Sequence, residues 1–194
     1  MNIDKLVEII NDGGLAIVPT DTVYGIIADA TNEDAINRVY EAKRRVYSKP
    51  LIIMVSSLEM LFRYVDNVSE VEQKLIERYW PGKLTILFKR GSKLSGLINN
   101  NGDLVGIRYP DNEELIDLMN RLDKPLVSTS ANIADEGTIT SVDKISEDLL
   151  KYIDYVYDGG FKEDVPSTIV KVVDNKIEFL RKGELASVIE RDFM

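Results

Sequence analysis

A segment near the N-terminus reads Leu15-Ala16-Ile17-Val18-Pro19-Thr20-Asp21-Thr22-Val23-Tyr24-Gly25. Its opening apolar run predicts a buried strand, and hydroxyl and carboxylate side chains follow that run directly. Polar side chains at the end of a strand suggest a binding site, because a rigid strand can hold them in place. The same Thr and Asp side chains could instead bond their own backbone within a turn. Taken alone, the segment leaves both interpretations open.

Helical and extended patterns alternate along the rest of the chain. Apolar residues recur at helical spacing before Gly13-Gly14, and another helix begins at Thr31 or Asn32 and ends near Lys43. Further helices are expected over 69–79, 112–122 and 142–151, the last behind a Ser141 cap, and strands over 25–28, 51–55, 84–88, 105–107 and 126–128. A terminal hairpin is expected over 168–173 and 176–180, before a short helix. This order predicts an α/β fold whose sheet is partly antiparallel.

The size and composition of the chain suit one domain. Its 194 residues, 44% of them hydrophobic, can build one sizeable core, and we expect a single domain over 1–194. Apolar runs such as 51–55 fall far below the ~20 residues that a membrane helix needs. The N-terminus has no basic segment followed by an apolar stretch, so no signal peptide is expected. We therefore expect a cytoplasmic protein.

The chain contains no Cys and no His. This composition excludes disulfides, thiolate metal sites and any chemistry that uses imidazole as a base or ligand. Catalysis would have to use carboxylates, hydroxyls, Lys, Arg, backbone amides or a hard cation that arrives with the substrate. Nucleotidyl transfer fits this set, because positioning and charge neutralisation do most of the work there.

Acidic residues outnumber basic ones by 33 to 24, and the formal net charge is −9. Such an excess of negative charge disfavours broad nonspecific binding to nucleic acid. A local basic cluster nevertheless stands out, formed by Lys43, Arg44, Arg45 and Lys49. Because cations are also favoured at helix C-termini, this cluster is either an anion-binding loop or a solvated helix end.

Other segments complete a recognisable order along the chain: Lys49-Pro50-Leu51, Trp80-Pro81-Gly82-Lys83-Leu84-Thr85, Gly106-Ile107-Arg108-Tyr109-Pro110-Asp111, Ser128-Thr129-Ser130-Ala131-Asn132, Pro166-Ser167-Thr168 and Leu180-Arg181-Lys182-Gly183. Together with the first segment they resemble the YrdC-type family of threonylcarbamoyl-adenylate synthases, over nearly the whole chain. The resemblance implies a twisted open sheet of parallel and antiparallel strands with flanking helices. Because the chain ends soon after Arg181, it also implies the short, single-domain form.

The resemblance further implies an activity and a set of site residues. Members of this family make threonylcarbamoyl-AMP and pyrophosphate from L-threonine, bicarbonate or CO2, and ATP, for the threonylcarbamoyl-adenosine modification of tRNA. The residues implied on the threonine side are Thr22, Arg108, Ser128 and Ser167. Those implied on the ATP side are Arg45, Lys49, Ser130, Asn132, Thr138 and Arg181, and the residues implied as catalytic are Lys43 and Arg45. Mg²⁺ would be carried in with ATP, and we expect no protein ligand because no carboxylate cluster has suitable spacing.

Each of these residue types also has an ordinary structural role. The planar fork of Arg108 could grip a carboxylate at the end of a strand, but an isolated Arg there more often forms a surface ion pair, here with Asp111 or Glu113. The Ser and Thr hydroxyls commonly bond nearby backbone. Two positions also depart from the family pattern. Asp21 stands where many relatives have Glu, and Ala134-Asp135 stands where relatives often have Ser-Gly, which bears on Thr138.

Two alternatives remain open from the sequence. One is a paralogue that shares the fold without this reaction, such as the YciO-like branch or the carbamoyl-transfer domain of hydrogenase maturation proteins. The other is an RNA-binding module, which the net charge and the lack of aromatic residues interleaved with a basic stripe disfavour beyond weak binding. A synthase would need a downstream transferase that acts on tRNA, because its product is labile.

Overall fold

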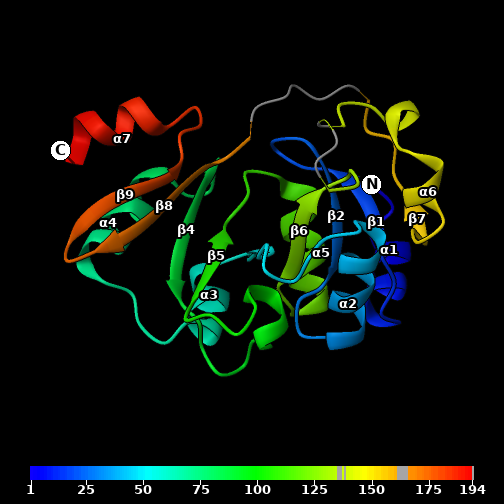
Figure 1. Cartoon of the computed structure of the whole chain (residues 1–194), viewed down its shortest axis with the longest axis horizontal. Helices are drawn as coiled ribbons and strands as arrows, with labels where there is room; N and C mark the ends of the chain where they lie inside the picture. Colours follow the sequence, from blue (N-terminus) through cyan, green and yellow to red (C-terminus); the bar gives the residue numbers. More distant parts are fainter. Residues whose placement is uncertain (135–136, 138, 161–165, 194) are drawn as a thin grey trace.

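The computed structural model describes residues 1–134, 137, 139–160 and 166–193. Helices and strands alternate along most of the chain (Figure 1). Their bounds are α1 Ile3–Asn11, β1 Ala16–Pro19, β2 Tyr24–Asp29, α2 Glu33–Ala42, β3 Ile52–Met54, α3 Leu58–Tyr64, α4 Glu70–Tyr79, β4 Leu84–Lys89, the 3-10 helix η1 Gly96–Asn99, β5 Leu104–Arg108, α5 Glu113–Leu122, β6 Leu126–Ser130, the 3-10 helix η2 Val142–Lys144, α6 Glu147–Leu150, β7 Tyr155–Val156, β8 Thr168–Val173, β9 Lys176–Arg181 and α7 Ala186–Phe193.

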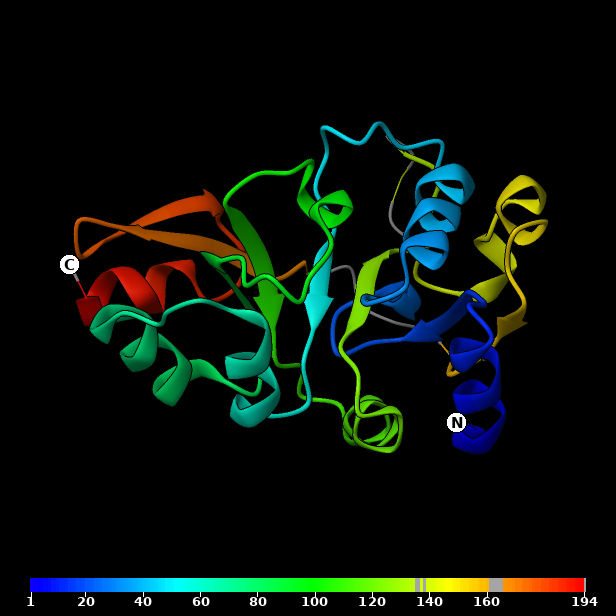
Figure 2. The same ribbon diagram turned by 90° about the horizontal axis from the view of Figure 1, so that it is seen from below.

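Within the described residues, nine strands form one open sheet in the order β7-β1-β2-β6-β3-β5-β4-β8-β9. The pairs β1/β7, β3/β5 and β4/β8 are parallel, and the other neighbours are antiparallel. Figure 2 shows α1, α3, α4 and α5 on one side of the sheet and α2 on the other. The expected mixed sheet with flanking helices is confirmed.

Helices cover both faces of the central strands, and this explains their apolar composition. Every residue of β1 and β2 is buried, as expected for strands that lie between two helical layers. Capping fixes where the covering helices begin. The side chain of Asn32 accepts the N–H groups of Asp34 and Ala35, and Ser69 and Glu72 form the expected capping box on α4.

One expected helix is wrong. Residues 142–151 do not form one helix behind Ser141, whose side chain makes no capping bond. The segment divides into η2 and α6 because Ser146 caps a new helix by accepting the N–H of Leu149, and Ile145 between them is extended. Helix α3 and strand β7 were not expected from the sequence.

No helix in the described part of the chain combines the length and the apolar character that crossing a membrane requires.

Candidate active site

The segment after the first strand forms the turn of a hairpin. β1 and β2 pair antiparallel with Pro19 opposite Tyr24, so Thr20 to Val23 make the connection. The hydroxyl of Thr20 donates to the carbonyl of Val23 at 2.7 Å, which is the backbone role that a turn Thr often has. The hydroxyl of Thr22 instead contacts side chains, Thr20 Oγ1 at 2.9 Å and Arg108 Nη1 at 3.2 Å. The turn thus directs one hydroxyl toward the end of β5.

Arg108 ends β5 and is only 4% exposed, so it is not in a surface ion pair with Asp111 or Glu113. Its counter-ion is Asp21, whose Oδ1 lies 3.0 Å from Arg108 Nη2. The two groups are not aligned for a hydrogen bond, so attraction between opposite charges holds the pair. The pKa of Arg108 is lowered, because burial lowers it more than the charge of the Asp21 carboxylate raises it. Asp111 contributes only its backbone N–H, which donates to Asp21 Oδ2 at 3.3 Å.

A cavity of about 240 Å³ opens beside this pair. Its described lining contains three guanidinium groups, those of Arg45, Arg108 and Arg181, and no carboxylate. Such a cavity favours anionic ligands, because low-dielectric walls strengthen the field of charges of one sign. The other lining residues are Thr20, Thr22, Val23, Gly25, Pro50, Ile52, Thr85, Ser128, Thr129, Ser130, Pro166 and Ser167.

The basic cluster after α2 divides into members with different environments. Lys43 is 1% exposed, and its ammonium donates to the carbonyls of Ser130 and Asn132 and to Asn132 Oδ1. Lys43 and Asn132 therefore lie behind the cavity wall, where they fix the turn after β6. Arg44 is outside the described lining of the cavity and pairs with the half-exposed Asp148 at 2.8 Å.

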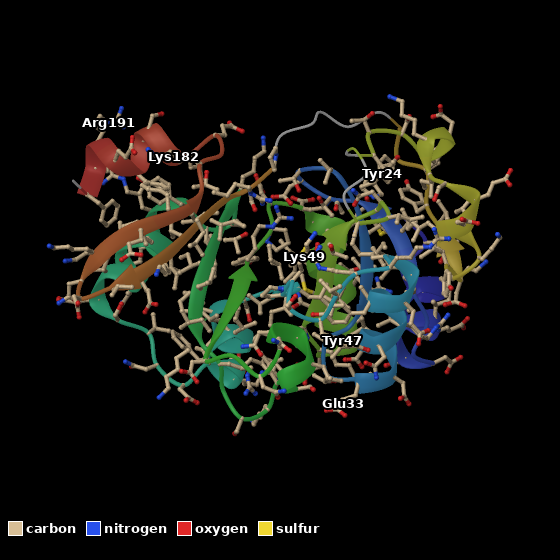
Figure 3. All side chains as sticks on the ribbon, viewed as in Figure 1. Tyr24, Glu33, Tyr47, Lys49, Lys182 and Arg191 are labelled. Atoms are coloured by element: carbon tan, nitrogen blue, oxygen red, sulfur yellow. The ribbon has the colours of Figure 1, made fainter. Side chains whose placement is uncertain are left out.

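Arg45 reaches the cavity from the same loop. Its Nε donates to the carbonyl of Lys49 and its Nη2 to the carbonyl of Pro50, each at 2.9 Å. These bonds hold the guanidinium in place, and Arg45 is part of the described lining of the cavity. Lys49 lies on this loop, near the middle of the molecule in Figure 3.

The opposite wall comes from the C-terminal hairpin. Arg181 ends β9, where its Nε donates to the Ser167 carbonyl at 2.8 Å and its Nη2 to Ser167 Oγ at 2.9 Å. Ser167 Oγ also shares a 3.0 Å hydrogen bond with Thr85 on β4. Arg181 as a whole residue is exposed, but its guanidinium is partly buried. This burial lowers the pKa of Arg181, and the positive charge of Arg108 lowers it further.

The structure thus brings most of the expected site residues to one cavity. Those in the lining are Thr22, Arg45, Arg108, Ser128, Ser130, Ser167 and Arg181. Lys43 and Asn132 support the wall without lining it, and Lys49 is likewise outside the described lining. Thr138 lies outside the described residues. The roles of all these residues in binding and catalysis stay predictions.

Several residues of the site received no role from the sequence. Thr20 and Thr85 line the cavity, and Asp21 balances the charge of Arg108. Thr20 and Asp21 belong to the first segment quoted above, and Thr85 ends the Trp80-Pro81-Gly82-Lys83-Leu84-Thr85 segment. Their position in those segments was therefore the signal that could have found them. The residues they contact come from distant parts of the chain, so the contacts themselves had no local signal.

The described residues contain no group of three or more Asp or Glu side chains that could hold a metal ion. Mg²⁺ is often held by substrate phosphates and water with only one or two carboxylates. The expectation that Mg²⁺ arrives with ATP stays a prediction.

A sequence model of the Sua5/YciO/YrdC family, described as "Telomere recombination", matches residues 8–183. The chain belongs to this family. A Methanocaldococcus jannaschii member of the family, provisionally named threonylcarbamoyl-AMP synthase, is 41% identical over 177 residues, which cover 91% of this chain and 82% of that protein. The threonylcarbamoyl-AMP synthase of Pyrococcus abyssi is 34% identical over 177 residues, covering 91% of this chain and 52% of that protein.

Solved structures of Sua5/YciO/YrdC proteins share the fold. Pyrococcus abyssi Sua5 complexed with L-threonine superposes with a TM-score of 0.91 at 32% identity, covering 97% of this chain and 56% of that one. Escherichia coli YciO superposes with a TM-score of 0.84 at 24% identity, covering 94% of this chain and 89% of that one, which supports the fold alone. The chain thus spans about half the length of the P. abyssi relative and most of the M. jannaschii one.

Proposed function

We propose that the chain is an L-threonylcarbamoyladenylate synthase, which makes threonylcarbamoyl-AMP and pyrophosphate from L-threonine, bicarbonate or CO2, and ATP. The observation that carries the proposal is the cavity with three guanidinium groups, in a chain that superposes closely on a Sua5 structure containing L-threonine. The names of the relatives favour this activity over a paralogue that only binds RNA or nucleotide. With this activity the protein is a nucleotidyltransferase that supplies an intermediate for tRNA modification.

The two walls of the cavity suggest where each substrate binds. On one side Arg108, with Thr22 and Ser128, suits the carboxylate and hydroxyl of L-threonine, because a guanidinium fork matches a carboxylate and hydroxyls can donate and accept. On the other side Arg45 and Ser130 suit the phosphates of ATP with its Mg²⁺. Lys43 supports this second wall through its bonds to Ser130 and Asn132.

The reaction requires these substrates to meet in one place. The neutral amine nitrogen of threonine bonds to the carbon of CO2 and releases a proton, which gives a carbamate. A carbamate oxygen then bonds to the α-phosphorus of ATP as the bond to pyrophosphate breaks. The arginines would stabilise the charge that develops on the phosphate oxygens. The product is a labile mixed anhydride, so a downstream transferase must consume it on tRNA.

The first prediction is that release of pyrophosphate requires ATP, L-threonine and bicarbonate together. Each substrate is omitted in turn while pyrophosphate is measured. Serine should be used less well than threonine, because one buried methyl group is worth only about 1–3 kcal/mol. Release that is unchanged without threonine would eliminate the synthase activity, and equal use of glycine would argue against a threonine pocket.

A second prediction concerns Gly25, which lines the floor of the cavity. A Cβ at this position would lie 3.2 Å from Thr20 Cγ2 and 3.4 Å from the Thr129 carbonyl. The added methyl group would also lie 3.6 Å from Ser128 Oγ, a residue assigned to the threonine side, so Gly25→Ala should weaken threonine binding by roughly 10-fold, about 1.4 kcal/mol. Calorimetry with threonine measures this, and ATP binding is the internal control. Unchanged threonine affinity in a normally folded variant would show that the ligand does not reach this floor.

A further inference from the structure

A second hollow lies between helices α3 and α4, and we call it the α3/α4 groove. It is bounded by these two helices and by residues 65–68 between them, and its volume is about 430 Å³, larger than that of the cavity. The groove and the cavity share no described lining residue. Helices α3 and α4 lie on the side of the sheet opposite α2 (Figure 2). The proposed reaction therefore makes no use of this groove.

The α3 side of the groove is apolar and open to solvent. Leu58 and Phe62 are 39% and 58% exposed, and Phe62 is the most exposed aromatic residue in the described part of the chain. The lining continues inward through Val65 and Ile76, which are buried in the core. Covering such contiguous apolar surface is favourable, because it removes the surface from water. The groove thus has the apolar character of a docking surface.

The spacing of the lining residues suits a helical partner. Leu58 and Phe62 lie four positions apart on α3, and Gln73 and Glu77 lie four positions apart on α4, so each helix contributes one face along about 6 Å of its axis. Side-chain ridges of a third helix can pack into a groove between two helices. An extended peptide would instead pair with the edge of a sheet, which α3 and α4 do not offer.

The charge of the groove selects the kind of helix. Its described lining contains the carboxylates of Asp66 and Glu77 and no Lys or Arg. Glu77 accepts a hydrogen bond at 2.9 Å from the neutral side chain of Gln73, so its charge is not balanced by that contact. Asp66 lies 3.7 Å from Lys89, but both side chains are largely exposed and such a pair is weak. Cationic side chains of a partner therefore complement this rim.

The same charges disfavour two other occupants. A second copy of the chain on a two-fold axis would place Asp66 and Glu77 against the same residues of its partner, because a two-fold interface joins one patch to itself. Like charges that face each other across an interface repel. An anionic lipid surface would meet the acidic rim and a chain of net charge −9.

We propose that the α3/α4 groove docks an amphipathic helix of a partner protein, with apolar residues one turn apart and Lys or Arg residues beside them. Phe62 is the apolar anchor, since aromatic residues contribute most strongly to such contacts. Glu77 and Asp66 favour a basic helix over an acidic one. Docking leaves the cavity uncovered by any residue of the groove, so this site does not depend on the proposed function.

The test uses three labelled synthetic peptides of about 18 residues, roughly five helical turns. The first carries Leu at helical spacing with Lys beside each Leu. The second has Glu in place of every Lys, and the third has the composition of the first with Leu and Lys in alternation. Fluorescence anisotropy should show the first peptide binding at least about 10-fold more tightly than either control. The third peptide separates helical docking from plain attraction to a negatively charged protein.

Two variants locate the bound peptide. Phe62→Ser should weaken binding of the first peptide about 10-fold, the effect expected for loss of an anchor residue. Glu77→Lys should weaken it and reduce its dependence on salt. Tyr152→Ser is the matched control, because Tyr152 is an exposed aromatic residue outside the groove lining. All three positions are exposed, and circular dichroism verifies that each variant is folded.

The proposal fails if no peptide binds, if the Lys and Glu peptides bind equally, or if Phe62→Ser and Tyr152→Ser have the same affinity for the first peptide. Two further measurements identify a different occupant, which would also overturn it. Sedimentation would reveal a dimer of the wild-type chain that Phe62→Ser dissociates. Flotation with vesicles of phosphatidylcholine and phosphatidylglycerol would reveal membrane binding that the same variant abolishes.

Discussion

Replacing Arg108 with alanine should reduce threonine affinity steeply and leave ATP binding in the absence of threonine almost unchanged. The proposed contact is a buried guanidinium against a substrate carboxylate, and truncating one partner of such a pair costs about 2–5 kcal/mol. Arg108 is 4% exposed, so the proposed contact lies largely away from bulk solvent. Calorimetry with threonine and, separately, with ATP measures the two affinities.

This change also disturbs the protein itself. Without Arg108, the Asp21 carboxylate, only 6% exposed as a side chain, is left unpaired, which costs about 3–5 kcal/mol of stability. The double variant Arg108→Met with Asp21→Asn removes both charges and should recover much of that stability without recovering threonine binding. Arg108→Lys should recover only part of the affinity, because an ammonium cannot form two parallel bonds.

The outcome that contradicts this prediction is also specific. If Arg108→Ala binds threonine normally while its thermal stability falls, Arg108 is only the ion-pair partner of Asp21. The threonine side of the cavity would then have to be assigned again, starting from Thr22 and Ser128.

Local sequence patterns predicted the elements well where one signal dominated. The apolar run before Pro19 predicted β1, and the Ser69 and Glu72 spacing predicted the start of α4. The expected helix over 142–151 failed because two candidate caps, Ser141 and Ser146, compete in the same segment and only the second forms its bond. Apolar periodicity alone does not decide between such caps.

The sequence indicated which residues belong to the site, but it did not indicate which residues they contact. The sequence placed Arg108 on the threonine side and offered an ion pair with nearby Asp111 or Glu113 only as the structural alternative. Its counter-ion in the structure is Asp21, which the chain brings from the first hairpin. The order of strands in the sheet creates this pair, and no local pattern encodes that order. Lys43 illustrates the same limit, since burial against the turn after β6 separates it from its neighbour Arg44.

The second large effect is expected for Arg45→Ala, compared with Arg44→Ala as the matched control. Arg45 lines the cavity, and loss of one preorganised donor to a reacting oxyanion costs about 100-fold in turnover. Arg44 is a solvated helix-end residue whose pair with Asp148 has both side chains largely exposed. Such surface pairs contribute about 0–1 kcal/mol, so Arg44→Ala should retain nearly normal turnover.

Loss of loop order has to be separated from loss of a phosphate contact, because Arg45 also donates to the carbonyls of Lys49 and Pro50. Comparing ATP with adenosine makes the separation. A phosphate contact predicts that Arg45→Ala weakens ATP binding much more than adenosine binding, since only ATP presents the negative charge. A disordered loop predicts that both ligands weaken together. Small, equal effects from Arg44→Ala and Arg45→Ala would mean that the whole basic cluster is a solvated helix end, and the phosphates would then have to bind elsewhere in the cavity.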